Sequence, residues 1–144
     1  MSFLIKYKKL SAQEKKLFWK AWFWLFVARL NTTFLPSKKY LKKLGRDKTL
    51  TSENNMPEHE EYVRILKKSI RRAVKYTPFK TKCLQQAYAG KIILNKANIP
   101  STVYFGLAKD KNNKLIAHAW LRTGNIIVTG EKEKSKFTVV QYIS

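Results

Sequence analysis

The chain of 144 residues is long enough to bury one hydrophobic core and too short for two domains of ordinary size. Its hydrophobic fraction of 44% and its aromatic fraction of 13% exclude a chain that is disordered throughout. The 30 Lys and Arg against 9 Asp and Glu give a net charge of +21, which favours acidic peptides, polyanions or anionic lipid surfaces as partners and says little about the fold.

The first predicted helix begins after Ser11, because Ser11 and Glu14 have the spacing of a capping box, and it extends to about Leu30. Apolar residues nearly encircle this helix. We therefore expect this helix to pack within the fold or to bind a partner. As a second choice, helix 11–30 makes contact with a membrane surface.

Export and membrane insertion are not expected. The uninterrupted apolar run of the first helix, residues 21–28, is far shorter than the roughly 20 residues that a spanning helix needs. No small-x-small cleavage site follows the run, and a single cysteine cannot form an internal disulfide. We therefore predict a cytoplasmic protein.

Three further helices are predicted before the periodicity changes, at residues 36–45, 57–75 and 83–95. The polar stretch 46–57 is rich in turn-forming residues and is predicted to be a linker or an exposed loop. Helix 57–75 is the clearest amphipathic helix of the chain, because apolar residues repeat at i, i+3 and i+4 on one face and Lys and Arg fill the other.

Beyond Pro100 the pattern changes to β-branched and aromatic residues, which are typical of strands. The expected strands are residues 101–107, 115–122, 125–129 and 136–142. Helices followed by strands predict an α+β fold, for which we expect an antiparallel meander. We divide the chain into an N-terminal helical region, residues 1–50, and a core, residues 51–144, within one compact unit.

Cys83 lies at the predicted start of a helix, which is a suitable position for a nucleophile. A catalytic cysteine reacts as the thiolate, and a helix N-terminus with Lys80 and Lys82 beside it favours that form. The free N–H groups of the first turn can bind an oxyanion. His118 lies mid-strand, where its imidazole can be held over the helix end as a base. A buried structural cysteine and a structural histidine are the alternatives that the residues alone leave open.

A resemblance to a known family is carried by residues 80–130, KTKCLQQAYAGKIILNKANIPSTVYFGLAKDKNNKLIAHAWLRTGNIIVTG, and by the FTVV that follows. The pieces CLxQA, IPSTVYFGLAKD, AHAWL and IIVTG resemble, in the same order, the leader peptidases of lasso-peptide biosynthesis, which belong to the transglutaminase-like cysteine-hydrolase superfamily. The resemblance implies a papain-like/transglutaminase-like core, with the cysteine-bearing helix packed on an antiparallel sheet. It also implies Cys83 as nucleophile, His118 as general base, and hydrolysis of the bond between the leader and the core of a precursor peptide.

The third catalytic residue departs from the family pattern, in which an acid follows the histidine strand. Pairing through the predicted turn places His118 opposite about Gly130, which has no side chain. Glu131 is the nearest acid and is the predicted third residue, and Asp110, in the preceding loop, is the alternative. A backbone carbonyl or an amide can orient the imidazole instead, as an amide does in papain-like enzymes. Trp120 faces the same side of the strand as His118, either beside the catalytic pair or as a core aromatic.

The resemblance also implies partners: the leader region of a precursor peptide, a separate winged-helix leader-recognition protein, and an ATP-dependent macrolactam synthetase. Peptide hydrolysis itself needs no cofactor and no metal. The rival from another class is a basic, non-catalytic module that binds nucleic acid or anionic membrane. The sequence contains no zinc-finger spacing, RNP-type strand motif or Gly-rich phosphate loop, so we expect no nucleic-acid partner. Transfer of the acyl group to an amine is the rival among enzymes.

Overall fold

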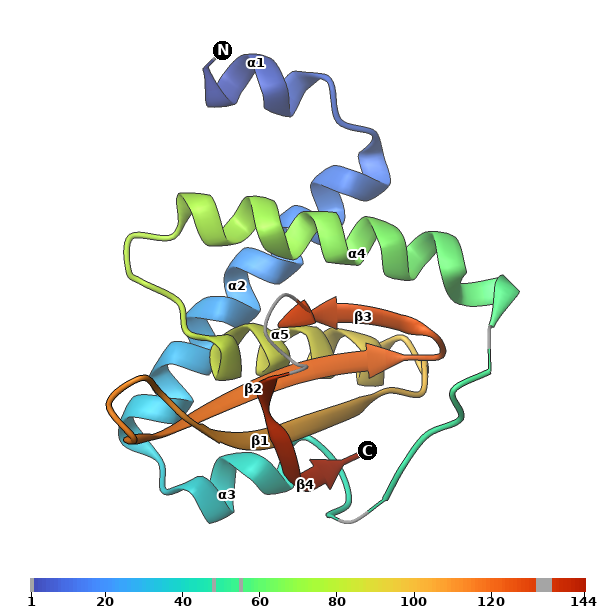
Figure 1. Ribbon diagram of the computed structural model, residues 1–144. Helices are drawn as coiled ribbons and strands as arrows, with labels where there is room; N and C mark the ends of the chain where they lie inside the picture. Colours follow the sequence, from blue (N-terminus) through green and yellow to red (C-terminus); the bar gives the residue numbers. More distant parts are fainter. Residues whose placement is uncertain (1, 48, 55, 132–135) are drawn as a thin grey trace.

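The computed structural model describes residues 2–47, 49–54, 56–131 and 136–144, which form helices on one side of a small sheet (Figure 1). The helices are α1 Phe3–Lys8, α2 Ala12–Phe34, α3 Ser37–Lys42, α4 Pro57–Tyr76 and α5 Cys83–Lys96. The strands are β1 Thr102–Lys109, β2 Leu115–Thr123, β3 Ile126–Thr129 and β4 Thr138–Ile143. The predicted α+β class is confirmed, with the cysteine-bearing helix α5 packed against the antiparallel sheet.

The N-terminus of α2 has the predicted capping box. The Glu14 N–H donates to Ser11 Oγ at 3.2 Å, and the Ser11 N–H donates to Glu14 Oε2 at 2.7 Å. The bond from the Ser11 backbone holds the pKa of Glu14 below its ordinary value. The helix ends at Phe34, one turn beyond the predicted end, and the short helix α1 before it was not predicted. Of the helices that the structure describes, none combines the length and the apolar character that crossing a bilayer requires.

The sheet has the strand order β3-β2-β1-β4, and every pair is antiparallel. The predicted meander is therefore wrong for β4, which pairs with β1 and not with β3. The helix α4 packs against β3 at one end of the sheet, and β4 extends the opposite edge beside β1. The turn between β2 and β3 contains Gly124 at φ 55°, a left-handed conformation that favours glycine.

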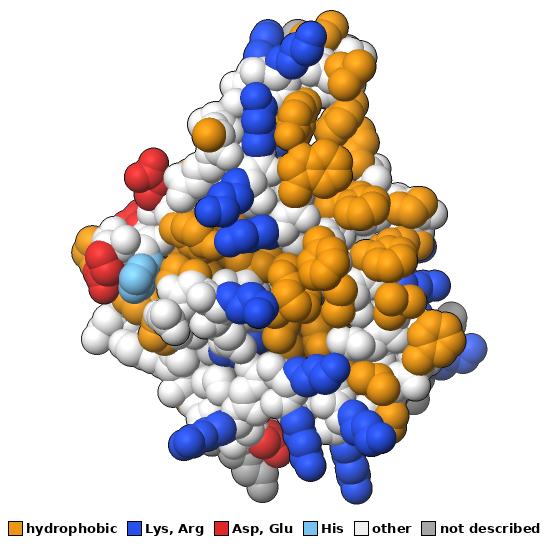
Figure 2. All heavy atoms as spheres, turned by 180° about the vertical axis from the view of Figure 1, so that it is seen from behind, with side chains coloured by type: hydrophobic (Ala, Val, Ile, Leu, Met, Phe, Trp, Pro, Cys, Tyr) orange, Lys and Arg blue, Asp and Glu red, His pale blue; other side chains and the backbone are white. Residues whose placement is uncertain are grey.

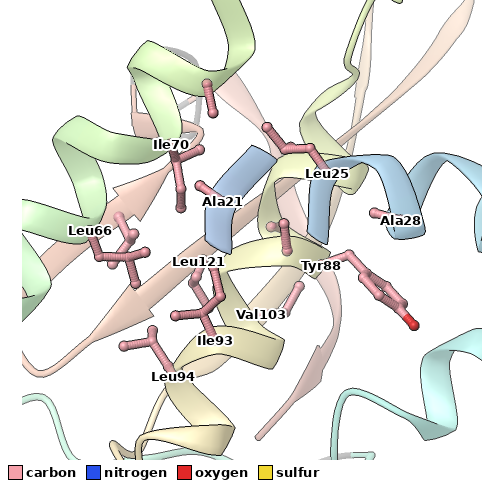
Figure 3. Close-up of a cluster of buried hydrophobic side chains, with 14 of the residues drawn as sticks. Ala21, Leu25, Ala28, Leu66, Ile70, Tyr88, Ile93, Leu94, Val103 and Leu121 are labelled. Carbon is pink, nitrogen blue, oxygen red and sulfur yellow. The ribbon is translucent and has the colours of Figure 1, made fainter. Parts of the chain in front are cut away.

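The core lies between the sheet and the helices α2, α4 and α5 (Figure 3). Leu25 from α2, Ile70 from α4 and Leu121 from β2 are almost completely buried in it. Gly90 lets α5 approach the sheet closely, since a Cβ there would lie 2.6 Å from Leu121 Cδ2. Because α2 packs against both α4 and α5, the N-terminal helices share this core. The division of the chain at residue 50 stays a prediction.

Buried Arg122 fastens the loop before α4 to the sheet. Its Nη1 donates to the carbonyl oxygens of Ser52 (2.9 Å) and Gly124 (2.8 Å), and its Nη2 donates to that of Thr51 at 2.8 Å. Its Nε donates to Tyr104 Oη at 3.0 Å. These bonds satisfy a guanidinium that would otherwise be costly to bury, and they fix a loop that the composition alone predicted to be exposed.

Candidate active site

Cys83 is the first residue of α5, and its side chain is partly buried. The Ala119 N–H donates to Cys83 Sγ at 3.4 Å, so the sulfur lies against β2 next to His118. This N–H is available because the pairing between β2 and β3 begins at Leu121, two residues after Ala119. The first N–H groups of an α-helix have no acceptor within the helix, and those of α5 begin at the cysteine.

His118 lies in the middle of β2, opposite Gly106 of β1, and is partly buried. Its Nε2 lies 2.9 Å from the carbonyl oxygen of Gly130. A carbonyl oxygen only accepts, so Nε2 carries the proton in this bond, and Nδ1 is the basic nitrogen of the neutral ring. The sequence placed His118 opposite about Gly130, and the two residues are in contact through the imidazole and a main-chain carbonyl, although the strand pairing itself ends at Leu121 and Thr129.

Gly130 has a conformation that a side chain would disturb. Its φ of 76° lies in the left-handed region. A Cβ at this position would lie 2.6 Å from the Ala119 carbonyl oxygen and 3.0 Å from His118 Nε2. The glycine therefore lets the chain leave β3 with its carbonyl against the imidazole.

Aromatic rings also pack against the imidazole of His118. The His118 ring stacks on Phe137, with centroids 5.0 Å apart, and on Trp120, at 5.8 Å. Trp120 in turn stacks on Tyr104 at 5.5 Å. Gly106 leaves the room for this arrangement, because a Cβ there would lie 2.7 Å from Phe137 Cβ. Trp120 therefore lies on the same side as His118 and is buried beside it.

Cys83 and His118 line one cleft of about 280 Å³. Its walls come from α4, from the first turn of α5 and from the end of β3. The other lining residues are Lys67, Ile70, Arg71, Gln86, Val128, Thr129, Gly130 and Glu131. The cleft is thus rich in cations on its α4 side and presents one thiol and one imidazole to whatever enters it.

The two candidate acids lie in different places. Glu131 is on the cleft wall, where its Oε2 pairs with Lys67 Nζ at 2.8 Å. Asp110 lies in the turn between β1 and β2, and its Oδ1 accepts from the Asn112 and Lys114 N–H groups at 2.8 and 2.9 Å. The structure therefore brings Glu131, and not Asp110, to the cleft. A catalytic role for Glu131 stays a prediction.

Several contributors to this site were not foreseen from the sequence. The Ala119 N–H and the Gly130 carbonyl are both main-chain groups. The expected strand register indicated Gly130 as a neighbour of His118, and nothing indicated Ala119. The basic face of α4 was recognised, but nothing in the sequence placed Lys67 and Arg71 beside Cys83. Within the described residues, no cluster of three or more His, Cys, Asp or Glu side chains is arranged to hold a metal ion.

The chain matches the model of the family described as "Transglutaminase-like superfamily" over residues 30–142. Comparisons with curated proteins and with solved structures gave no significant match. The matched range contains α3 to α5, the strands β1 to β3, all but the last residue of β4, and the candidate catalytic pair Cys83 and His118. The superfamily includes cysteine proteases, so the match supports an enzymatic function of that general kind. The family matches most of the chain, and this protein therefore belongs to the transglutaminase-like superfamily.

Proposed function

We propose that this protein is a cysteine peptidase that removes the leader peptide from a lasso-peptide precursor. The observation that carries the proposal of a peptidase is the pairing in the cleft: the Cys83 thiol receives the N–H of Ala119, the residue after His118, and the His118 Nε2 is tied to the Gly130 carbonyl. The choice of a lasso-peptide precursor rests on the sequence resemblance of residues 80–130.

In the acylation step the Cys83 thiolate attacks the scissile carbonyl carbon. The N–H groups at the start of α5 stabilise the oxyanion that forms. His118, protonated at Nδ1 after taking the thiol proton, gives that proton to the leaving nitrogen as the C–N bond breaks. The amine product is the core peptide with a new N-terminus, and the leader remains on Cys83 as a thioester.

In the deacylation step water attacks the thioester. Neutral His118 takes a proton from this water through Nδ1, the C–S bond breaks, and the leader leaves as a carboxylate. Throughout the cycle Nε2 keeps its proton in the bond to the Gly130 carbonyl, which fixes the tautomer that the chemistry needs. We propose that this carbonyl orients the ring, and that Glu131 supports the cleft wall through Lys67.

The proposal includes partners. A separate winged-helix protein would bind the leader and deliver the precursor to the cleft, and a macrolactam synthetase would consume the new N-terminus of the core. The cations of α4 at the cleft suit a substrate with acidic side chains near the scissile bond, since Lys67 and Arg71 both line it.

The test mixes the purified protein with the precursor peptide encoded beside its gene and any neighbouring leader-binding protein, and follows cleavage by mass spectrometry. Wild type is expected to cut at one site, and Cys83→Ala and His118→Ala are expected to give no product. His59→Ala is the matched control, because the chain has two histidines and His59 lies on α4 outside the cleft lining. Alkylation provides a second test, since the single thiol makes it specific for Cys83.

The outcomes separate the alternatives. Cleavage that persists in Cys83→Ala or after alkylation would overturn the mechanism. A product in which an added amine caps the leader carboxyl end would identify acyl transfer in place of hydrolysis. No cleavage by wild type with the leader-binding protein present would favour a non-catalytic binding module.

A further inference from the structure

Helix α2 has two apolar faces, and only one of them is used by the fold. The buried face consists of Leu17, Phe18, Ala21, Leu25 and Ala28. The opposite face consists of Trp19, Phe23, Phe26, Leu30 and Phe34, whose side chains are 42 to 77% exposed. With 3.6 residues per turn, these five positions span only about 80° of the helix circumference. We call them the aromatic stripe.

The stripe is held in place by its neighbours. The Trp19 and Trp22 rings lie 6.1 Å apart, and Trp22 stacks on Phe26 at 6.4 Å. The indole N–H of Trp19 donates to Tyr7 Oη at 2.8 Å, and that of Trp22 donates to the Tyr76 carbonyl oxygen at 3.3 Å. Because these polar groups are satisfied within the protein, the stripe offers solvent an ordered and almost wholly apolar surface.

The apolar surface continues beyond α2. Leu4 and Ile5 of α1 are 66% and 49% exposed, and Phe79, in the segment before α5, contacts Phe26 at 6.1 Å. Figure 2 shows the result as a continuous hydrophobic band on the face opposite to that of Figure 1. Contiguous exposed apolar surface of this kind marks a contact site.

The charge beside the band has one sign. Residues 3–43 contain 11 Lys and Arg and a single acid, Glu14. The Glu14 carboxylate accepts from the Ser11 N–H in the capping box, and its Oε1 lies 3.8 Å from Arg72 Nη2. By helix geometry Lys16 and Lys20 lie along one side of the stripe, and Lys15 and Arg29 lie along the other. In Figure 2 Lys and Arg side chains stand beside the hydrophobic band, and acidic side chains gather mainly at the left edge.

We propose that the aromatic stripe docks this protein on an anionic membrane surface, with α2 lying flat in the headgroup region. The stripe is a helix face about 22 Å long, with Trp, Phe and Leu on it and cations on both sides, which are the residue types that interfacial helices present to headgroups and acyl chains; unlike such a helix, α2 buries its other face in the core of the protein. The cations would contact lipid phosphates while the rings enter the boundary with the acyl chains. No residue of the stripe lines the cleft, so docking leaves the cleft open. The inference is independent of the proposed peptidase activity.

Co-sedimentation of the full chain with phospholipid vesicles tests the proposal. We expect binding to vesicles rich in phosphatidylglycerol, weak binding to pure phosphatidylcholine, and release by salt. Replacing Phe23 and Phe26 by Gln should weaken binding at least about tenfold. The matched control replaces Val139 and Val140 of β4 by Gln, since these are also exposed apolar residues, and it should bind like wild type.

The charge part of the proposal has its own variant. Lys16→Gln with Lys20→Gln should weaken binding to the anionic vesicles about 30-fold, as expected when two lysines near the headgroups are lost. Lys111→Gln with Lys114→Gln makes the same change of net charge in the turn between β1 and β2, and it should have a much smaller effect. Equal effects of the two pairs would mean that net charge, and not the stripe, drives binding, which would overturn the proposal.

Other results would also overturn it. These are failure of wild type to bind anionic vesicles, and unchanged binding by the Phe23 and Phe26 variant. A dimer that this variant abolishes, without vesicle binding, would assign the stripe to a second copy of the chain. If the variant fails to fold, wild type still decides: three of the four tryptophans lie in α2, and their fluorescence should be quenched by brominated lipid. Absence of quenching would overturn docking through this face.

Discussion

The cleft and the N-terminal helices are held in contrasting ways. In the cleft, main-chain groups position the reactive side chains: the Ala119 N–H meets the Cys83 sulfur, and the Gly130 carbonyl meets the His118 ring. In α2 the positions are set by side-chain packing, since its inner face fills the core and its outer face stays 42 to 77% exposed among the described residues. The cleft should therefore be sensitive to changes of backbone conformation, and α2 to changes of side-chain volume on one face only.

The largest effect should come from comparing the two faces of α2. Leu25 is completely buried, and Leu25→Ala should lower the free energy of unfolding by about 3 to 4 kcal/mol, because it removes apolar contact and leaves a cavity. Phe23 is 54% exposed, and Phe23→Ala should change it by less than about 0.5 kcal/mol. Urea denaturation measures both. Similar losses in the two variants would mean that the outer face is covered within the folded chain.

A second test concerns α5, which carries Cys83 into the cleft and packs against α2. Lys91 is almost fully buried, its Nζ donates to the Ser101 carbonyl oxygen at 2.8 Å, and burial lowers its pKa to about 8 from an ordinary value of 10.5. Between pH 8 and pH 10.5 the unfolded chain therefore binds more protons at this residue than the folded one. Stability should rise with pH across this window, by up to about 3 kcal/mol from this group.

The control for this pH effect is Lys91→Met, which keeps the length of the side chain without the amine. Other lysines also lose charge as pH rises, and the resulting fall in self-repulsion stabilises both proteins alike. The expected result is a steeper rise of the unfolding free energy in wild type than in Lys91→Met. Parallel curves would show that the buried amine keeps an ordinary pKa.

Gly130→Ala should have the next largest effect, and it tests the main-chain control of the cleft. The added Cβ would meet the Ala119 carbonyl and the His118 ring. We expect the rate of precursor cleavage to fall about 100-fold, because a ring displaced by even 1 Å loses its alignment with the thiol. The matched control is Gly124→Ala, at a glycine that also has a positive φ and where a Cβ would lie 2.9 Å from the Asn54 carbonyl oxygen, but which does not line the cleft. It should lose stability and keep its activity per folded molecule.

Much of the fold could be predicted from local patterns. The capping box at Ser11 and Pro57 at the start of α4 gave correct helix starts, and the β-branched and aromatic composition beyond Pro100 gave the four strands. The partner of β4 could not be predicted, because it depends on which sheet edge the helices cover. The two apolar faces of α2 were visible as a helix that is apolar all round, but which face enters the core depends on α4 and α5.

For the site, the sequence indicated a thiol at a helix start and a histidine on a strand, and register placed Gly130 beside the histidine. It could not indicate that Ala119 would bond the sulfur, because every residue carries an N–H and nothing in the sequence distinguishes this one. It also favoured Glu131, since a side-chain acid is visible in a sequence and a carbonyl that points at an imidazole is not.

The smallest effect is expected for Glu131→Gln, and it bears on which group orients the imidazole. The Glu131 carboxylate pairs with Lys67 at 2.8 Å, and its side chain is 52% exposed. An ion pair so exposed contributes about 0.2 to 1 kcal/mol, so the unfolding free energy should change by no more than this. The His118 Nε2 already has the Gly130 carbonyl as its acceptor, so cleavage should fall less than about fivefold.

Measuring the dependence of kcat on pH for Glu131→Gln distinguishes the two candidate orienting groups. A carboxylate that contacts the imidazole stabilises its protonated form, so its loss would lower the apparent pKa of the basic limb and reduce kcat 50-fold or more. Orientation by the carbonyl predicts an unchanged profile of kcat against pH, and Lys67→Gln, which removes the other half of the ion pair, should then also leave this profile unchanged. A shifted profile in Glu131→Gln alone would make Glu131 the third catalytic residue. The Gly130 carbonyl would then be only a secondary contact of the imidazole. In that case a side chain would help to position the imidazole, and the cleft would differ from α2 only in degree.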